Sequence, residues 1–235
     1  MKFNKFNLFH YLIFAFGYVI FNLFYVMNFS KNKKNKAIIL YGHRFYGNLK
    51  NLYETLDGKY ECLYLTLDYS IYKKLKTEKI KVLFALRPKD IKYLINSKIV
   101  VTDHGLHYFK KLLKDKGKIF IDVNHGLPFQ RWNKELVEQW YSFNEVWLFS
   151  KLHKDIYINK FGYEKEENLF ITGYGRLDYI KKFNKTNNKE MVLKSLKNKY
   201  GLNGDKKTVL YAPTWIHNKN LIKNEFMNPK NIGFI

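Results

Sequence analysis

The sequence has very little cysteine, since Cys62 is the single one among 235 residues. An internal disulfide is therefore impossible, which argues against an exported domain held together by disulfide bridges. Cys62 lies in the apolar run CLYL of residues 62–65. We expect a buried thiol at this position rather than a reactive nucleophile.

Recognisable metal ligands are also missing. His104 and His107 are three residues apart, but no cysteine or acidic pair accompanies them at ligand spacing. We interpret them as a turn residue and a residue at a helix start. Neither a metal ion nor another cofactor is expected.

Acidic residues are scarce, with 20 Asp and Glu against 42 Lys and Arg, which gives a net charge of +22. Such a charge attracts polyanions, including nucleic acids, anionic lipids and nucleotides. The lysines are spread along the chain, and no zinc finger, RNA-binding signature or basic heptad is present. We therefore do not expect nucleic acid to be the main partner.

Charge is absent from residues 8–29, LFHYLIFAFGYVIFNLFYVMNF. A signal peptide would be shorter and would end in small residues. The length suits a retained anchor of residues 1–36 that spans the bilayer or lies in its interface, and a buried core helix is the alternative. Lys31, Lys33, Lys34 and Lys36 follow the run, so we expect the body of the protein at the cytoplasmic face of the cell membrane, against anionic lipid.

Short apolar runs alternate with helical patterns from residue 36 onward, which predicts an α/β fold with a parallel sheet. The predicted strands are residues 36–41, 61–67, 81–86, 98–102, 118–123, 145–150 and 169–172. The predicted helices are residues 49–56, a segment around residue 75, and residues 88–95, 108–113 and 153–160. Ligands of such sheets bind beyond the carboxyl ends of the strands. His43, His104 and His125 each follow a predicted strand and could face one crevice, although three solvated turn histidines are the alternative.

The C-terminal part of the sequence is organised differently. Residues 181–204 are polar and predict a linker or a surface helix. Residues 207–211 predict one further strand, and one strand cannot bury itself. We interpret residues 205–235 as the start of a second, truncated domain.

Four short motifs follow one another along the chain and together resemble those of a known family. They are GHRFYGNLKNLYETL at residues 42–56, HGLP at 125–128, GYGRLD at 173–178 and LYAPTW at 210–215. In this order and spacing the sequence resembles the CDP-glycerol glycerophosphotransferase family, the teichoic acid primases and polymerases, over roughly residues 37–217.

The resemblance implies a GT-B-like fold of two Rossmann-like domains, with residues 37–180 as the acceptor-side domain and most of the donor-binding domain missing. It implies membrane association at the cytoplasmic face. It also implies transfer of glycerol phosphate, or a related polyol phosphate, from a CDP-linked donor to a hydroxyl of a lipid-linked acceptor in teichoic-acid-like or capsule polymer synthesis. The alternatives are another GT-B glycosyltransferase of surface polysaccharide synthesis, or an inactive, membrane-associated fragment.

His125 is the predicted general base, because a neutral imidazole can take the proton of an acceptor hydroxyl. The predicted substrate-binding residues are Gly126, Arg131, Arg176, Asp178, Pro213, Thr214, His43 and Asn48. Arg131 and Arg176 could stabilise the charge of the transferred phosphoryl group, and Asp178 could instead pair with Arg176.

The sequence departs from the family pattern near these residues. Asn124 stands where tryptophan is usual, Leu127 where threonine is usual, and Gln130 where lysine is usual. Gly175 replaces a proline, and Ile216 replaces an arginine. These departures concern the donor side of the expected chemistry, so the identity of the transferred group is open at this point.

Overall fold

A computed structural model of the chain describes residues 8–28, 35–42, 44–106, 109, 112, 117–126, 143–185 and 189–202. The chain forms two compact units, Met1–Lys182 and Phe183–Ile235. The first unit contains every strand that the structure describes. The second contains α8 (Lys189–Tyr200), whose described side chains are exposed.

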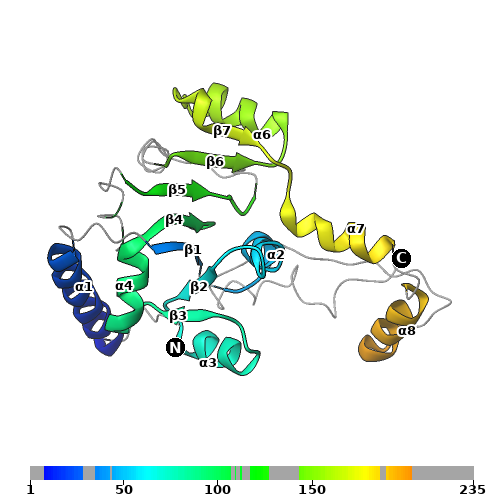
Figure 1. Ribbon diagram of the computed structural model, residues 1–235. Helices are drawn as coiled ribbons and strands as arrows, with labels where there is room; N and C mark the ends of the chain where they lie inside the picture. Colours follow the sequence, from blue (N-terminus) through cyan, green and yellow to red (C-terminus); the bar gives the residue numbers. More distant parts are fainter. Residues whose placement is uncertain are drawn as a thin grey trace, which may run out of the picture. The chain divides into compact units, whose positions relative to one another are not determined.

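Seven parallel strands form one sheet in the order β3-β2-β1-β4-β5-β6-β7. Figure 1 shows the sheet from the edge strand β3 to the opposite edge strand β7. All seven predicted strands are confirmed, and the parallel arrangement is confirmed with them. Their bounds are β1 (Asn35–Tyr41), β2 (Cys62–Thr66), β3 (Val82–Phe84), β4 (Ser97–Thr102), β5 (Ile119–Asp122), β6 (Glu145–Leu148) and β7 (Leu169–Ile171).

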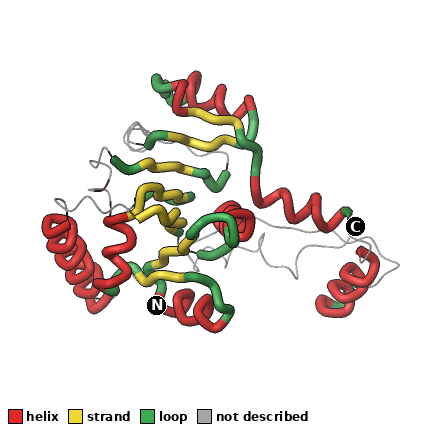
Figure 2. Tube along the Cα trace, viewed as in Figure 1, coloured by secondary structure: helices red, strands yellow, loops and turns green. Residues whose placement is uncertain are grey.

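Helices cover both faces of the sheet (Figure 2). The helical elements besides α8 are α1 (Leu8–Asn28), α2 (Gly47–Leu56), α3 (Tyr69–Thr77), α4 (Pro88–Asn96), α6 (Lys151–Asp155), the π-helix η3 (Ile156–Lys160), the 3₁₀ turns η4 (Glu166–Asn168) and η5 (Gly175–Leu177), and α7 (Asp178–Asn184). Asp68 caps α3 by accepting the backbone N–H groups of Ser70 and Ile71, as expected for an N-cap aspartate. Of the predicted helix at residues 108–113, only Phe109 and Leu112 are described.

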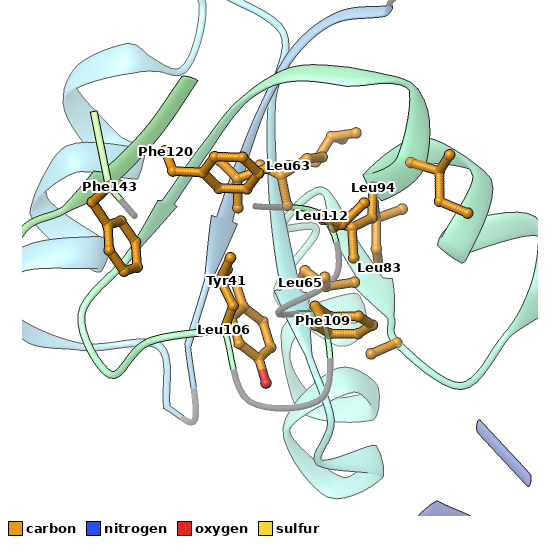
Figure 3. Close-up of a cluster of buried hydrophobic side chains, with 14 of the residues drawn as sticks. Tyr41, Leu63, Leu65, Leu83, Leu94, Leu106, Phe109, Leu112, Phe120 and Phe143 are labelled. Atoms are coloured by element: carbon orange, nitrogen blue, oxygen red, sulfur yellow. The ribbon is translucent and has the colours of Figure 1, made fainter. Parts of the chain in front are cut away.

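Alternate residues of the strands β1 to β6 enter two separate apolar clusters. Ile39 and Tyr41 of β1 belong to the cluster under α1 and α4, whereas Leu40 belongs to the cluster under α2 and α3. Figure 3 shows the first cluster, where Tyr41, Leu65 and Phe109 lie together. Cys62 is fully buried in the second cluster, and burial raises the pKa of its thiol to about 12. The expectation of a buried thiol at this position is confirmed.

A buried lysine ties α4 to the sheet. Lys118 is 3% exposed, and its ammonium donates to the backbone carbonyl oxygens of Leu94 at 3.2 Å, of Ile95 at 2.6 Å and of Ser97. The last carbonyls of a helix lack intrahelical partners and carry partial negative charge, so a cation stabilises them.

One side of α1 packs against the sheet unit, beside α4 (Figure 1). Phe21 is fully buried, and its ring meets the ring of Phe109 edge-on at 5.2 Å. Other apolar side chains of α1 are exposed, among them Phe16 at 65%, Val26 at 74% and Met27 at 68%. Within the described residues, no helix has the length and apolar character needed to cross a membrane. The segment thus combines a core contact with an apolar outer face, and its role as an anchor stays a prediction.

Candidate active site

The loop after β5 is organised by Asn124, directly before His125. Its φ of +46° lies in the left-handed region, which asparagine tolerates because its short side chain hydrogen-bonds locally. Its side-chain oxygen accepts the backbone N–H groups of His125 at 2.8 Å and Gly126 at 3.2 Å. Its amide nitrogen donates to the hydroxyl of buried Tyr157. Asn124 therefore turns the chain and fixes the backbone of His125.

The ring of His125 is held in one orientation. Its Nδ1 lies 2.8 Å from the backbone carbonyl oxygen of Asp103. A carbonyl oxygen only accepts, so Nδ1 carries the hydrogen and Nε2 keeps a lone pair in the neutral ring. Burial, and then the neighbouring His104, lower the pKa of His125 below the ordinary histidine value. The lowered pKa favours the uncharged imidazole at neutral pH.

His104 lies directly against His125. The two rings are stacked, with centroids 4.4 Å apart and planes inclined by 6°. Nδ1 of His104 is 2.6 Å from Oδ1 of Asp103, and this hydrogen bond raises the pKa of His104. The expectation that histidines following different strands meet in one place is confirmed for this pair, while His43 lies outside the described residues.

Gly42 allows Asp103 to approach the end of β1. A Cβ atom at position 42 would lie 2.5 Å from Cδ1 of Leu49 and 3.3 Å from Oδ1 of Asp103. Two non-bonded carbon atoms do not come this close, so a side chain at position 42 would require the Leu49 side chain to shift. The glycine that opens the first motif is thus explained by packing beneath the histidine pair.

Asn48, in the first turn of α2, joins two loops. Its amide nitrogen donates to the carbonyl oxygens of Asn124 at 2.7 Å and Val123 at 3.2 Å. Its oxygen accepts the backbone N–H of Arg176 at 3.1 Å. Asn48 therefore holds the loop after β5 against the turn after β7, and its role in substrate binding stays a prediction.

Arg176 brings positive charge to this place. Its guanidinium donates to the carbonyl oxygen of His125 and to the hydroxyl of Tyr174, and it lies 4.1 Å from the centre of the Tyr174 ring. Its Nε is buried and has no hydrogen-bond partner among the residues that the structure describes. The alternative that Arg176 pairs with Asp178 is wrong for the described structure, because the guanidinium contacts His125 and Tyr174 instead. Asp178 begins α7, where a carboxylate is favoured by the helix dipole.

Few described atoms lie close to Gly126, which follows His125. The nearest described atom to a Cβ at this position would be the hydroxyl oxygen of Tyr174, at an ordinary contact distance of 3.7 Å. The described protein atoms therefore do not require a glycine here.

Several predicted site residues lie outside the described residues. These are His43, Arg131, Pro213 and Thr214, so their roles stay predictions. Sequence reasoning missed Asp103, Asn124 and Tyr174 as parts of the site. Asp103 could have been noticed because it follows a strand just as His104 does. Among the described residues, no group of three or more histidines, cysteines and carboxylates could hold a metal ion.

The family model of CDP-glycerol:poly(glycerophosphate) glycerophosphotransferase matches residues 23–231, which is most of the chain. The chain belongs to this glycerophosphotransferase family. The resemblance carried by the four motifs is thereby confirmed.

A curated relative is a teichoic acid poly(glycerol phosphate) polymerase from Bacillus spizizenii. It is 24% identical over 216 residues, which cover 82% of this chain and 53% of the relative. The chain therefore spans about half the length of the curated relative that it matches.

Solved structures of the wall teichoic acid polymerase TagF have a similar fold. One shares 16% sequence identity with a TM-score of 0.65, and the match covers 88% of this chain and 54% of TagF. A TagF variant soaked with CDPG shares 18% identity with a TM-score of 0.64, and the match covers 90% of this chain and 58% of the variant. At these identities the similarity concerns the fold, and it agrees with the predicted α/β class.

Proposed function

We propose that this chain carries the acceptor side of a glycerophosphotransferase. The reaction is transfer of glycerol phosphate, or a related polyol phosphate, from a CDP-linked donor to a hydroxyl of a lipid-linked acceptor in the synthesis of a teichoic-acid-like or capsule polymer. Family membership supports the reaction class, and the CDPG-soaked TagF variant supports a CDP-linked donor. The donor half would lie in a second Rossmann-like domain, as in a GT-B arrangement.

The observation that carries the proposal is the state of His125. With Nδ1 bound to the Asp103 carbonyl, Nε2 takes the proton of the acceptor hydroxyl. The acceptor oxygen forms a bond to the donor phosphorus that bears the polyol, and the bond from that phosphorus to the bridging oxygen breaks. CMP leaves with the electron pair of that bond.

The neighbours of His125 suit this transfer. Arg176 supplies positive charge next to the base, where the negative charge of the phosphoryl group develops. Gly126 leaves room for the acceptor, and Asn48 keeps both loops together. These roles rest on a fixed geometry, since most of the contacts involve backbone atoms.

The test measures CMP or UDP release by membranes that bear the whole gene product. CDP-glycerol, CDP-ribitol and UDP-sugars are offered as separate donors, and UDP release would favour the alternative glycosyltransferase. We expect His125→Ala to lower turnover by roughly 100- to 10,000-fold, the usual contribution of a positioned base. Turnover within about threefold of the parent at saturating substrates would contradict the assignment.

His153→Phe is the matched control for loss of a histidine, because His153 is buried in α6. It should retain turnover, and circular dichroism should show that both variants are folded.

We also propose that the protein lies at the cytoplasmic face of the cell membrane through α1. Its exposed apolar side chains suit the acyl–headgroup boundary, as in interfacial helices. The lysines at positions 31, 33, 34 and 36 follow directly. Each lysine near an anionic surface contributes about 1 kcal/mol, so both attractions act at the same end of the chain.

A further inference from the structure

Asp103 contacts two histidines through two different groups. Its carboxylate Oδ1 lies 2.6 Å from Nδ1 of His104, and its backbone carbonyl oxygen lies 2.8 Å from Nδ1 of His125. Asp103 is 8% exposed, whereas His104 and His125 are exposed residues. One residue at the end of β4 thus sets the orientation of both rings.

The stacking of the two rings removes the remaining freedom of His125. The planes are almost parallel, at 6°, and the centroids are 4.4 Å apart. A ring that is hydrogen-bonded at Nδ1 and covered on one face by another ring can neither flip nor tilt without losing one of these contacts. Nε2 therefore keeps a constant direction, and it makes no hydrogen bond within the part of the chain that the structure describes.

The charges around the pair differ between the two rings. Asp103, and more distantly Asp122, raise the pKa of His104 and favour its imidazolium form. His125 has Arg176 and His104 beside it, with Asp103 partly opposing them. Two imidazolium rings at this separation repel each other, so the charge of His104 favours the neutral form of His125.

We propose that Asp103 and His104 form a positioning pair for His125, which presents Nε2 of an uncharged His125 ring to the acceptor hydroxyl. The link to proton transfer rests on the proposed function. The effect of the pair on the tautomer and charge of His125 is independent of the proposed function, and it can be measured without an activity assay.

The test is a pH titration of the chain labelled with ¹³C and ¹⁵N at histidine, followed by NMR. His125→Gln assigns the His125 signals. In the parent we expect Nδ1 of His125 to carry the hydrogen and its titration midpoint to lie below that of His104. His104→Phe keeps a stacked ring but removes the charge, so the His125 midpoint should rise. Asp103→Asn should lower the midpoint of His104.

Two results would overturn the proposal. One is a neutral His125 protonated at Nε2 in the parent, which requires no variant. The other is an unchanged His125 midpoint in folded His104→Phe, or in His104→Gln if the phenylalanine variant does not fold. A purely structural role for His104 would alter stability but not this midpoint. If the NMR results hold but His125→Ala retains turnover, the pair is supported and the proposed function fails.

Discussion

Single side chains at the ends of β4 and β5 give His104 and His125 different pKa shifts. Burial lowers the pKa of His125, whereas a carboxylate raises the pKa of its neighbour His104. The same residue type therefore has opposite protonation preferences at adjacent positions. For His104 the first cause is the hydrogen bond to the Asp103 carboxylate, whereas for His125 it is burial, which the contact with the Asp103 carbonyl oxygen partly opposes.

His153 is a third case, since it is fully buried and neither ring nitrogen has a hydrogen-bond partner in the described parts of the chain. The rings of Phe149 and Tyr157 lie 4.5 and 5.1 Å away. Burial lowers the pKa of His153 to about 4. An unfolded histidine titrates near 6.5, so between these pH values the unfolded chain binds a proton that the folded chain does not. The contribution to stability is present above about pH 6.5 and is lost as the pH falls towards 4.

We therefore expect His153→Phe to be more stable than the parent, by a margin that grows on acidification. The difference in the free energy of unfolding should increase by about 1–2 kcal/mol between pH 7.5 and pH 5. Urea unfolding at the two pH values measures it. His104→Phe is the matched control. Because the pKa of His104 is raised in the folded state, this variant should become less stable relative to the parent as the pH falls. An equal difference for His153→Phe at both pH values would count against this account.

At the scale of elements, α1 has two different sides. Phe21 packs against Phe109 in the core, whereas Phe16, Val26 and Met27 are exposed. Deleting residues 1–30 should release the protein from membranes, but it would also remove the Phe21 contact. Substitutions on the outer face are therefore the cleaner experiment.

We expect a combined Phe16→Glu, Val26→Glu and Met27→Glu variant to lose most of its sedimentation with membranes, because charged side chains are costly in the bilayer interface. Sedimentation is measured at high salt, which screens purely electrostatic attachment. The control carries Met191→Glu, Leu193→Glu and Leu196→Glu on α8, which exposes apolar side chains as well. Complete pelleting of the α1 variant would show that this face is not the attachment site.

At the scale of the whole sheet unit, the number of neighbouring strands should determine how stable each strand is against local opening. β1 and β4 each pair with two strands in the middle of the sheet, whereas β3 and β7 are edge strands with one neighbour. Edge strands contain three residues each, so they lose few contacts when they open. We expect Ile39 and Val100 to exchange their amide hydrogens only through global unfolding, and Leu83 and Phe170 through local opening.

Native-state hydrogen exchange with increasing urea distinguishes the two routes, because local opening depends weakly on denaturant. The central strands serve as the internal control for global unfolding. Exchange of Phe170 as slow and as urea-dependent as that of Val100 would contradict the expected order.

The sequence alone determined the fold class, the seven strands and the place of His125. Continuous apolar runs such as residues 62–65 predict strands buried on both faces, and chain order then restricts them to a parallel sheet. The motifs identified the family because they are local patterns. These inferences needed only neighbours in the sequence.

Only the tertiary structure decided what surrounds His125. The stacking on His104, the bond to the Asp103 carbonyl and the bridge through Asn48 join residues that are separated by 21, 22 and 128 positions. The two sides of α1 likewise depend on Phe109, which is far away in the chain. Composition and periodicity predict which helix or strand a residue belongs to and which face of that element it occupies. The pKa and orientation of a side chain depend on which other elements reach it, because electrostatic and packing interactions act only over a few ångströms.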